Sequence, residues 1–178
     1  MTSSPVHRRA VGPVALAAVL VVIDQISKHW AVTSLADGRI IELVGTLQLR
    51  LAFNTGMSFG LGAGWGRLIA PLAALVVVGL LLMVGRIPNR LGLFAVGLVM
   101  GGAIGNLIDR AFRAGDGFLG GGVVDFIDLQ WWPVFNVADM AIVVGAVLLA
   151  IATWGADDGS DTEQAGASRD AGAARDSA

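Results

Sequence analysis

Long apolar segments separated by short polar ones dominate the chain. Residues 10–23 carry no charge, and a helix starting there can continue through Asp24 and Lys28. Three further uncharged runs contain 18, 18 and 17 residues. A helix needs roughly 20 apolar residues to cross a bilayer, with a range of about 17–25. The pattern therefore predicts four transmembrane helices, with spans at about residues 10–30, 68–85, 91–108 and 138–156.

Two segments between the predicted spans have the pattern of strands. Residues 46–53, TLQLRLAF, alternate apolar and other side chains with a period of two, which is typical of a half-buried strand. Residues 121–132, GGVVDFIDLQWW, follow a glycine-rich turn and are rich in β-branched and aromatic residues. We expect a small sheet at the membrane surface, with Trp131 and Trp132 at headgroup depth. The predicted fold class is an all-α membrane protein with a small β element.

The charges around the spans do not decide how the predicted helices are oriented in the membrane. Four spans place both termini on one side, and Arg8, Arg9, Arg86 and Arg90 flank the ends that would then be cytoplasmic. Five other arginines lie on or near the opposite side, so a count of basic residues does not decide the orientation. These are Arg39, Arg50, Arg67, Arg110 and Arg113.

Composition narrows the class of protein. The chain of 178 residues is 55% hydrophobic and 15% charged, which is typical of a membrane protein. A net charge of −2 gives no indication of a nucleic-acid surface. The absence of cysteine excludes disulfides, thiolate metal sites and a cysteine nucleophile, and two histidines cannot form a histidine-rich metal site. Residues 1–9 are interpreted as a cytoplasmic tail. Residues 157–178, with six acidic and two basic side chains, are expected to be a disordered acidic tail.

An alternative interpretation of the N-terminus is a cleaved secretory signal peptide. Residues 1–36 would form it, with TSLA as the cleavage site. Asp24 and Lys28 interrupt the apolar run where the small-residue cleavage region should begin. This position argues against the alternative.

Polar residues in the first and third spans have structural explanations. Asp24 and Lys28 are four residues apart, so they share a helix face and can form a neutralising ion pair. Asn106 and Arg110 have the same spacing, with Asp109 beside them. Gly97, Gly101 and Gly105 recur at every fourth position, which allows another helix to approach closely. Intramembrane polar groups, however, usually face an interior site.

Asp139 begins the fourth span and has two interpretations. Asn136 can be the N-cap of a helix in which Asp139 is the third residue, where a carboxylate suits the helix dipole. The same carboxylate can be part of a catalytic site. Asp125 and Asp128, three residues apart on a predicted strand, point to opposite faces, so only one of them can reach such a site and the other is solvated or structural.

The distribution of the polar residues favours a site over a set of unrelated caps. Eight of them fall at the same ends of the predicted helices or in the loops that join those ends. They are Asp24, Lys28, Asn54, Asn106, Arg110, Asp125, Asn136 and Asp139.

Five motifs in these regions resemble the lipoprotein signal peptidase family, also called signal peptidase II. They are DQISK, FNTGMSFG, GGAIGNLIDR, VVDF and FNVAD, in the family's order over roughly residues 14–155. Met57 stands where the family often has alanine. The resemblance implies an aspartyl endopeptidase of the bacterial cytoplasmic membrane that removes the signal peptide of prolipoproteins just before a diacylglyceryl-modified cysteine. It also implies no cofactor, a functional monomer, and membrane lipids and prolipoproteins as partners.

The resemblance assigns roles to individual residues. Asp125 and Asp139 match the family's catalytic pair. The supporting residues match Asp24, Lys28, Asn54, Asn106, Arg110 and Asn136. The implied fold has four transmembrane helices in residues 10–156, an extracytoplasmic β-cradle at about 38–66 and 110–135, and a short amphipathic arm in GMSFGLGAGWGRL. Both termini are then cytoplasmic and the site lies near the extracytoplasmic face.

Two carboxylates can hydrolyse a peptide if they share one proton. Close like charges in a site of low dielectric constant raise one pKa and lower the other. The ionised carboxylate takes a proton from water, and the protonated one donates to the scissile carbonyl. Which of Asp125 and Asp139 is the initial base stays open, because such a pair titrates as a unit.

Three other functions are consistent with parts of the pattern. A presenilin-like intramembrane protease would use a glycine-aspartate motif within a helix and usually more spans. A proton-coupled transporter could use Asp24, Lys28 and Asp139 as a relay, and would need polar groups through the depth of the bilayer. A non-catalytic scaffold rests only on the glycine repeats.

The lipid of the implied substrate leads to one further expectation. The glycine-rich faces of the third and fourth spans are expected to leave room for an acyl chain beside the aspartates. Gly101, Gly105 and Gly145 lie on these faces.

Overall fold

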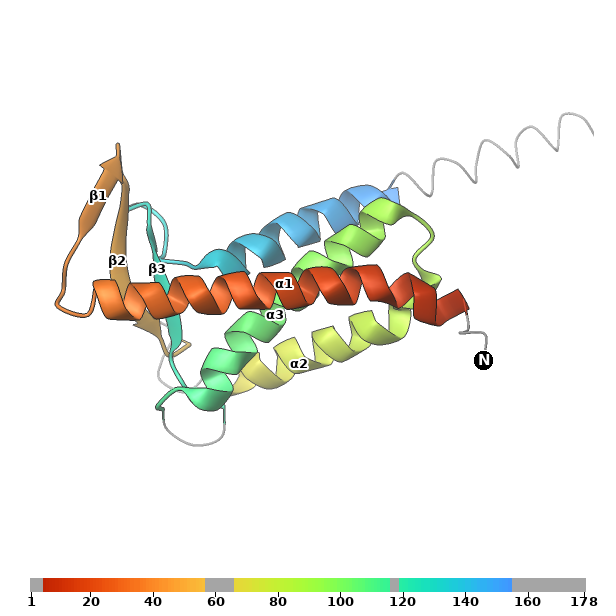
Figure 1. Ribbon diagram of the computed structural model, residues 1–178, viewed down its shortest axis with the longest axis horizontal. Coiled ribbons are helices and arrows are strands. Elements are labelled where there is room, and N and C mark those ends of the chain that lie inside the picture. The colour runs from red at the N-terminus through yellow and green to blue at the C-terminus, as the bar shows by residue number, and fades with distance from the viewer. Residues whose placement is uncertain (1–4, 57–65, 116–118, 155–178) are drawn as a thin grey trace, which may run out of the picture.

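A computed structural model of the chain describes residues 5–56, 66–115 and 119–154. Four helices run side by side, and a small sheet lies at one end of them (Figure 1). Most of the predicted arm, residues 57–65, and the whole predicted acidic tail lie outside the described residues. The combination of four helices and a small sheet confirms the predicted fold class.

The four helices are long and apolar enough to cross a membrane. They are α1 (Pro5–Ser34), α2 (Gly66–Met83, followed by the 3-10 helix η1, Val84–Arg86), α3 (Arg90–Phe112) and a C-terminal helix (Val137–Trp154). α1 extends beyond the predicted first span at both ends. Its last turns carry the chain past Lys28 to the sheet (Figure 1).

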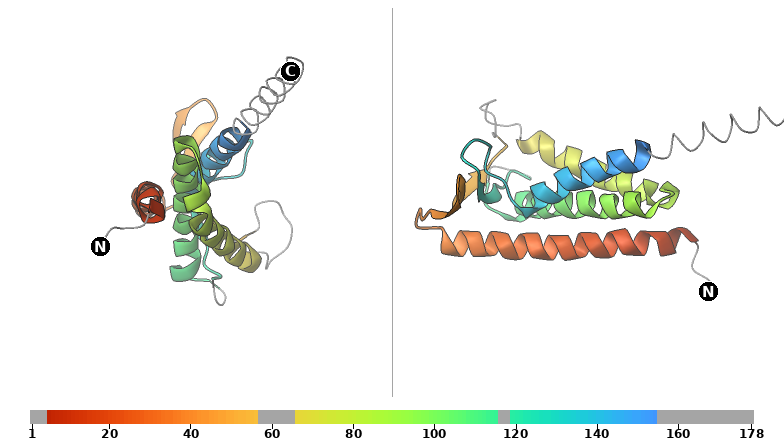
Figure 2. Two further views of the ribbon diagram at one scale, coloured as in Figure 1. Left: turned by 90° about the vertical axis from the view of Figure 1, so that its right-hand side faces the viewer. Right: turned by 90° about the horizontal axis from the view of Figure 1, so that it is seen from above.

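α3 is the central helix of the group. It packs against both α1 and α2 and is mostly buried, whereas the other three helices are mostly exposed (Figure 2). Glycines permit the close approach: a Cβ atom on Gly101 would lie 2.8 Å from Cβ of Leu20, and one on Gly105 would lie 2.6 Å from Oδ2 of Asp24. The predicted packing role of these glycines is confirmed.

The same contacts contradict the expectation that the glycine faces leave room for an acyl chain. The space beside Gly101 and Gly105 is occupied by residues of α1. A Cβ atom on Gly145 would lie 2.9 Å from the carbonyl oxygen of Ala95 in α3. Small residues here bring backbones together, and the space that they leave is occupied by the neighbouring helix.

The sheet contains three antiparallel strands in the order β1-β2-β3. β1 spans Ile41–Val44, β2 spans Leu47–Asn54, and β3 spans Val123–Asp128. β2 and β3 confirm the two strands predicted from the sequence, whereas β1 was not predicted. Gly45, at a φ of 59°, forms the tight turn between β1 and β2, a backbone conformation that glycine adopts without strain.

The third strand is tied to the start of the C-terminal helix. Phe135 pairs with Ile127: its N–H donates to the Ile127 carbonyl at 3.0 Å, and its carbonyl accepts from the Ile127 N–H at 2.9 Å. The pairing brings residue 136 back beside β3. It thereby places two segments of the chain, around Asp125 and Asp139, next to each other.

The end of the helices away from the sheet is closed by different contacts. Asn89 caps α3 by accepting from the N–H of Gly92 at 2.6 Å, and it donates to the carbonyl of Ala152 at 3.0 Å. Arg9 donates to the carbonyl of Ile87 at 3.4 Å. The start of α1, the α2–α3 connection and the end of the C-terminal helix therefore lie together, opposite the sheet (Figure 1).

Candidate active site

Asp139 and Asn136 form a reciprocal cap at the start of the C-terminal helix. The N–H of Asp139 donates to Oδ1 of Asn136 at 3.0 Å, and the N–H of Asn136 donates to Oδ2 of Asp139 at 3.2 Å. This is the geometry of a capping box, in which two otherwise unpaired backbone donors are satisfied. The capping interpretation is thus confirmed. It uses one carboxylate oxygen of Asp139, and the other, Oδ1, accepts from Nδ2 of Asn106 at 2.8 Å.

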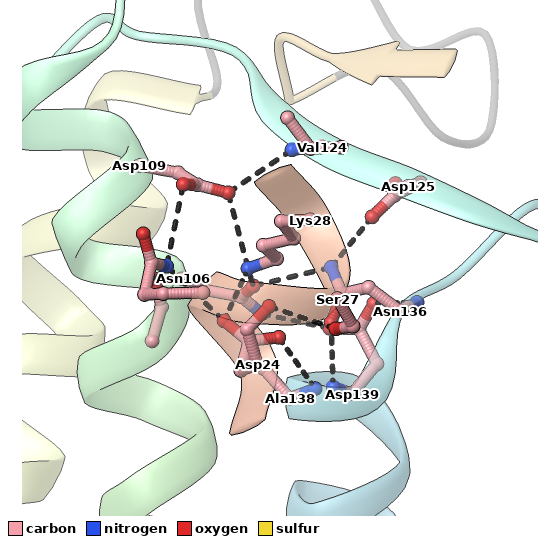
Figure 3. Close-up of polar contacts among 12 residues, drawn as sticks. Asp24, Ser27, Lys28, Asn106, Asp109, Val124, Asp125, Asn136, Ala138 and Asp139 are labelled. Carbon is pink, nitrogen blue, oxygen red and sulfur yellow. Dashed lines mark hydrogen bonds and ion pairs between the residues drawn. The ribbon is translucent and has the colours of Figure 1, made fainter. Parts of the chain in front are cut away.

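Asp125 lies on β3 and is connected to Asp139 through the same asparagine. Nδ2 of Asn136 donates to Oδ1 of Asp125 at 2.7 Å, so one amide caps the helix with its oxygen and binds the second aspartate with its nitrogen (Figure 3). The side chain of Asn54 also donates to Asp125. Asp125 is only 2% exposed, and Asn136 is fully buried.

Burial and a neighbouring charge change the acidity of Asp125. Burial raises the pKa of Asp125 to about 6, and the carboxylate of Asp139 acts in the same direction. Hydrogen bonds from Asn136 and Asn54 stabilise the ionised form and partly oppose this rise in the pKa. The Asp125 carboxyl therefore holds a proton at a pH where an ordinary aspartate is fully ionised.

A buried lysine connects these residues to α1 and α3. Nζ of Lys28 lies 2.8 Å from Asp24 and 3.0 Å from Asp109, and it donates to Oδ1 of Asn106 at 2.9 Å. The predicted ion pair between Asp24 and Lys28 is confirmed. Both side chains are essentially inaccessible, and so is Asp109. Figure 3 shows Lys28 between the two carboxylates.

Arg110 lies close to the carboxylates and keeps an unused donor. Its guanidinium interacts electrostatically with Asp125, Asp139 and Asp109. Within the described parts of the chain, its Nη1 is the one buried side-chain nitrogen or oxygen without a hydrogen-bond partner. A cation in this position favours the ionised forms of the neighbouring carboxylates.

Asp128 has a structural environment despite sharing β3 with Asp125. It accepts hydrogen bonds from Nε2 of Gln48 at 2.8 Å, from Nε of Arg50, and from the N–H of Gln130 at 2.7 Å. These donors outweigh the loss of hydration and lower the pKa of Asp128. Of the two alternatives for Asp128, the structural one is correct.

The charges of the site leave one carboxylate without a matching cation. Lys28, Arg110 and Arg113 carry three positive charges, whereas Asp24, Asp109, Asp125 and Asp139 can carry four negative ones. A single proton shared within the set makes it neutral, and Asp125 is the member whose pKa is raised to about 6. In the described residues, no group of three or more His, Asp or Glu side chains is arranged to hold a metal ion.

Two pockets of different character flank the two aspartates. A pocket of about 260 Å³ beside Asp125 is bounded by the end of β2 and by the loop before Asn136. Its lining residues are Ala52, Phe53, Asn54, Thr55, Asp125, Pro133 and Val134. A larger pocket of about 440 Å³ beside Asp139 has an almost wholly apolar lining. It consists of Leu129, Trp131, Trp132, Phe135, Asp139, Met140, Val143 and Val144.

The eight residues predicted from the sequence all lie at the sheet end of the helices. Seven of them form one hydrogen-bonded network: Asp24, Lys28, Asn54, Asn106, Asp125, Asn136 and Asp139. Arg110 borders it. Asp109 was noticed in the sequence but not placed in the site. The sequence feature that could have identified Asp109 is its spacing on α3. It follows Asn106 by three residues and precedes Arg113, with which it forms an ion pair, by four.

Comparison with known proteins agrees with this arrangement. Residues 16–155 match the family model of peptidase family A8, described as signal peptidase (SPase) II. The chain is 40% identical over 148 residues to the lipoprotein signal peptidase of Rhodococcus jostii (strain RHA1), which covers 83% of this chain and 74% of that protein. It is 41% identical over 138 residues to the lipoprotein signal peptidase of Mycobacterium tuberculosis (strain ATCC 25618 / H37Rv), covering 77% and 68% of the two chains.

The chain belongs to the signal peptidase II family. A solved structure described as a bacterial membrane enzyme, at 2.3 Å resolution, is similar to this signal peptidase II in fold. The TM-score is 0.70 at 27% sequence identity, and the match covers 81% of this chain and 88% of the other. The resemblance inferred from five short motifs is thus confirmed over most of the chain.

Proposed function

We propose that Asp125 and Asp139 are the catalytic dyad of this signal peptidase II, and that its substrates are prolipoproteins carrying a diacylglyceryl-modified cysteine. The observation that carries the proposal is the connection of the two carboxylates through Asn136 in a buried site, with the pKa of Asp125 raised to about 6. Such a pair can hold one proton between two carboxylates, which is the charge state that hydrolysis requires.

The chemistry follows from this charge state. With Asp125 protonated, the ionised Asp139 accepts a proton from a water molecule, and the oxygen of that water attacks the scissile carbonyl carbon. Asp125 donates its proton to the carbonyl oxygen, which gives a neutral tetrahedral intermediate. When the intermediate collapses, Asp139 gives its proton to the leaving amine and Asp125 recovers a proton from the intermediate hydroxyl. The pair returns to its starting state.

The remaining predicted residues support binding and charge. Arg110 provides a positive charge beside the dyad, since its guanidinium interacts electrostatically with Asp125 and Asp139. Asn54 is positioned by its own loop, because its Oδ1 accepts from the N–H of Gly56 at 2.9 Å. Asn106 and Asn136 donate to the aspartates, and Asp24 and Lys28 lie behind them.

The two pockets suit the two parts of the proposed substrate. The pocket beside Asp125 is lined by residues at the end of β2, among them Asn54, and it suits an extended peptide. The apolar pocket beside Asp139 suits an acyl chain, since each buried methylene group contributes about 0.8 kcal/mol. The acyl site thus lies on the outer face of the C-terminal helix, in place of the glycine faces predicted from the sequence.

The proposed orientation places the sheet and the site at the extracytoplasmic face. Arg9, Arg86 and Arg90 then lie at the cytoplasmic ends of the helices. The orientation rests on the resemblance to the family, because a count of basic residues does not decide it. The ends of α1 and of the C-terminal helix that lie away from the sheet point to this same side, which makes both termini cytoplasmic. The network that joins Asp125 to Asp139 is built from one chain, in keeping with a functional monomer.

The experiment compares one prolipoprotein with and without diacylglycerol on its cysteine. Both forms are reconstituted at equal density in liposomes with the purified full-length enzyme, and shortening is followed by gel mobility and mass. We expect cleavage just before the cysteine of the lipidated form and little of the other. Equal cleavage rates would show that the lipid only anchors the substrate in the membrane, and would contradict the proposal that the apolar pocket binds an acyl chain. Asp125→Asn is the inactive control. Cleavage of the substrate by that variant would contradict the proposed catalytic role of Asp125.

A further inference from the structure

The backbone directly before each aspartate of the dyad is held by another buried carboxylate. The N–H of Ala138, which precedes Asp139, donates to Oδ1 of Asp24 at 3.0 Å. The N–H of Val124, which precedes Asp125, donates to Oδ2 of Asp109 at 3.1 Å. The first contact joins the C-terminal helix to α1, and the second joins β3 to α3. Each aspartate of the dyad is therefore fixed one residue away from its own side chain.

Lys28 connects these two anchoring carboxylates. Its Nζ lies 2.8 Å from Oδ2 of Asp24 and 3.0 Å from Oδ2 of Asp109, and the three side chains are at most 1% exposed. A continuous series of contacts thus runs from Val124 to Ala138 through three buried side chains (Figure 3). Buried ion pairs need good geometry and further hydrogen bonds to offset the loss of hydration, and both are present here.

The lysine also fixes the orientation of Asn106. An ammonium group can only donate, so the oxygen of the Asn106 amide must face Lys28, which it does at 2.9 Å. The amide nitrogen is then turned toward Asp139, to which it donates at 2.8 Å. Lys28 therefore reaches the dyad by three routes: through each backbone anchor and through Asn106.

We propose that Asp24, Lys28 and Asp109 form a positioning frame that sets the separation and orientation of Asp125 and Asp139. Asp109, which the sequence did not place in the site, is a positioning residue in this frame. The inference rests on the proposed dyad. None of the three side chains lines either pocket, so the frame acts on turnover through backbone and amide contacts rather than by touching substrate.

This location predicts a separation of kinetic constants. Asp109→Asn keeps an oxygen that can accept from Val124 but loses the ion pairs with Lys28 and Arg113. A misplacement of a reacting group by about 1 Å can cost about 10²-fold in rate. For cleavage of a lipidated prolipoprotein, we therefore expect kcat to fall about 10²-fold, with KM within about threefold of the unmodified enzyme.

Asp37→Asn is the matched control. Asp37 also forms an ion pair, with Arg39 at 3.4 Å, but both side chains are 61% exposed. Its kcat and KM should equal those of the unmodified enzyme. A kcat of Asp109→Asn equal to that of this control, or a change in KM alone, would overturn the frame.

A double variant tests whether the frame acts as a unit. If Asp24 and Asp109 act through the shared Lys28, the Asp24→Asn/Asp109→Asn enzyme should lose about as much kcat as the more impaired single variant. Independent effects would multiply, to about 10⁴-fold if each single loss is about 10²-fold. A multiplicative loss would overturn the shared frame.

Folding and function are separated by two further measurements. Removing one partner of a buried ion pair leaves an uncompensated charge, so Asp109→Asn can fail to fold. Asp24→Asn/Lys28→Met/Asp109→Asn removes all three buried charges and leaves none of them unpaired. It should be folded, as judged by its thermal transition in detergent, yet reduced in kcat. Full activity in it would overturn the frame. Asp125→Asn is assayed in parallel: activity there would reject the dyad, whereas an inactive Asp125→Asn beside a fully active Asp109→Asn would reject the frame alone.

Discussion

Asp125 and Asp128 lie three residues apart on one strand, are both nearly inaccessible, and have opposite acidities. Burial raises the pKa of Asp125 to about 6, with Asp139 adding to the effect. The pKa of Asp128 is lowered, because Gln48, Arg50 and the Gln130 N–H bind its ionised form. Both side chains are nearly inaccessible, but Asp125 lies deeper in the protein and loses more hydration. Their partners differ as well, since Asp125 has a second carboxylate nearby where Asp128 has an arginine.

This comparison shows what marks a reactive carboxylate in a small membrane enzyme. Asp128 has an arginine within hydrogen-bonding distance and no neighbouring carboxylate among its named partners. Asp125 is buried beside a second carboxylate, and together these raise its pKa to about 6 although two amide donors act in the opposite direction. A buried carboxylate with its own cation is structural, whereas one that shares its surroundings with another carboxylate is ready to exchange a proton.

The largest expected effect separates the two aspartates directly. Asp125→Asn and Asp139→Asn should each reduce kcat at least about 10³-fold, because an amide of nearly the same shape cannot transfer the proton. Asp128→Asn should retain activity within about fivefold, since Asp128 touches neither pocket and its role is structural. The measurement is the cleavage rate per folded enzyme in detergent. Turnover by either dyad variant at a normal rate would remove that residue from catalysis.

Substitutions of residues beside the dyad should lower the rate of cleavage without changing the mechanism. Asn54→Ala and Arg110→Ala should each reduce kcat/KM about 10-fold to 100-fold. The first loses a hydrogen bond to Asp125, and the second loses a positive charge beside both carboxylates. The pH profile should stay bell-shaped, with its alkaline limb at or above about pH 6 in the unmodified enzyme. Since the Asn54 hydrogen bond lowers the pKa of Asp125, its loss should move this limb to higher pH. A profile that loses one limb entirely would place the altered residue in the chemistry itself.

Asp125 and Asp128 should change the pH dependence of the free energy of unfolding in opposite directions. The folded-state pKa of Asp125 is raised from 3.8 to about 6, so its contribution to stability is present below 3.8 and is lost as pH rises through 6. Asp125→Asn should therefore stabilise the protein at pH 8, by about 1–3 kcal/mol. The pKa of Asp128 is lowered, so its contribution is present above 3.8 and is lost as pH falls through its folded value.

The check is thermal unfolding in detergent at pH 4 and pH 8. Asp128→Asn should be destabilised at pH 8 by about 1 kcal/mol and less so at pH 4. Identical pH dependence in the two variants would show that the surroundings of Asp125 and Asp128 are equivalent.

The smallest expected effect concerns the apolar pocket. Trp132→Ala should raise KM for a lipidated prolipoprotein about threefold to tenfold with kcat little changed, because it removes apolar surface from acyl binding alone. Trp154→Ala is the matched control: this tryptophan is 77% exposed near the other end of the C-terminal helix and lines neither pocket. Equal KM values for the two variants would place the acyl chain elsewhere.

The sequence predicted those features that depend on local pattern. Four spans follow from uncharged runs, β2 and β3 from alternation and composition, and the Asn136 cap from its spacing to Asp139. β1 was missed because it is only four residues long and three of them are exposed. Its pattern therefore carries no sign of a buried face.

The features that it did not predict depend on contacts between distant segments. Gly145 and the α3 glycines had the right spacing for helix packing, but spacing does not say which surface is left open for a ligand. Asp109 looked like one more charged residue at a helix end. Its role follows from Lys28 and Val124, which are 81 and 15 residues away along the chain.

In the proposed mechanism, the cap formed by Asn136 and Asp139 links turnover to the helix dipole. A negative charge in the first turn of a helix is stabilised by about 0.3–1 kcal/mol. When Asp139 accepts a proton from water, the C-terminal helix loses that charge, and Oδ2 becomes a weaker acceptor for the Asn136 N–H. Release of the proton to the leaving amine restores both interactions. The start of the helix therefore favours the second half of each catalytic cycle, and it returns the enzyme to the state that can activate the next water molecule.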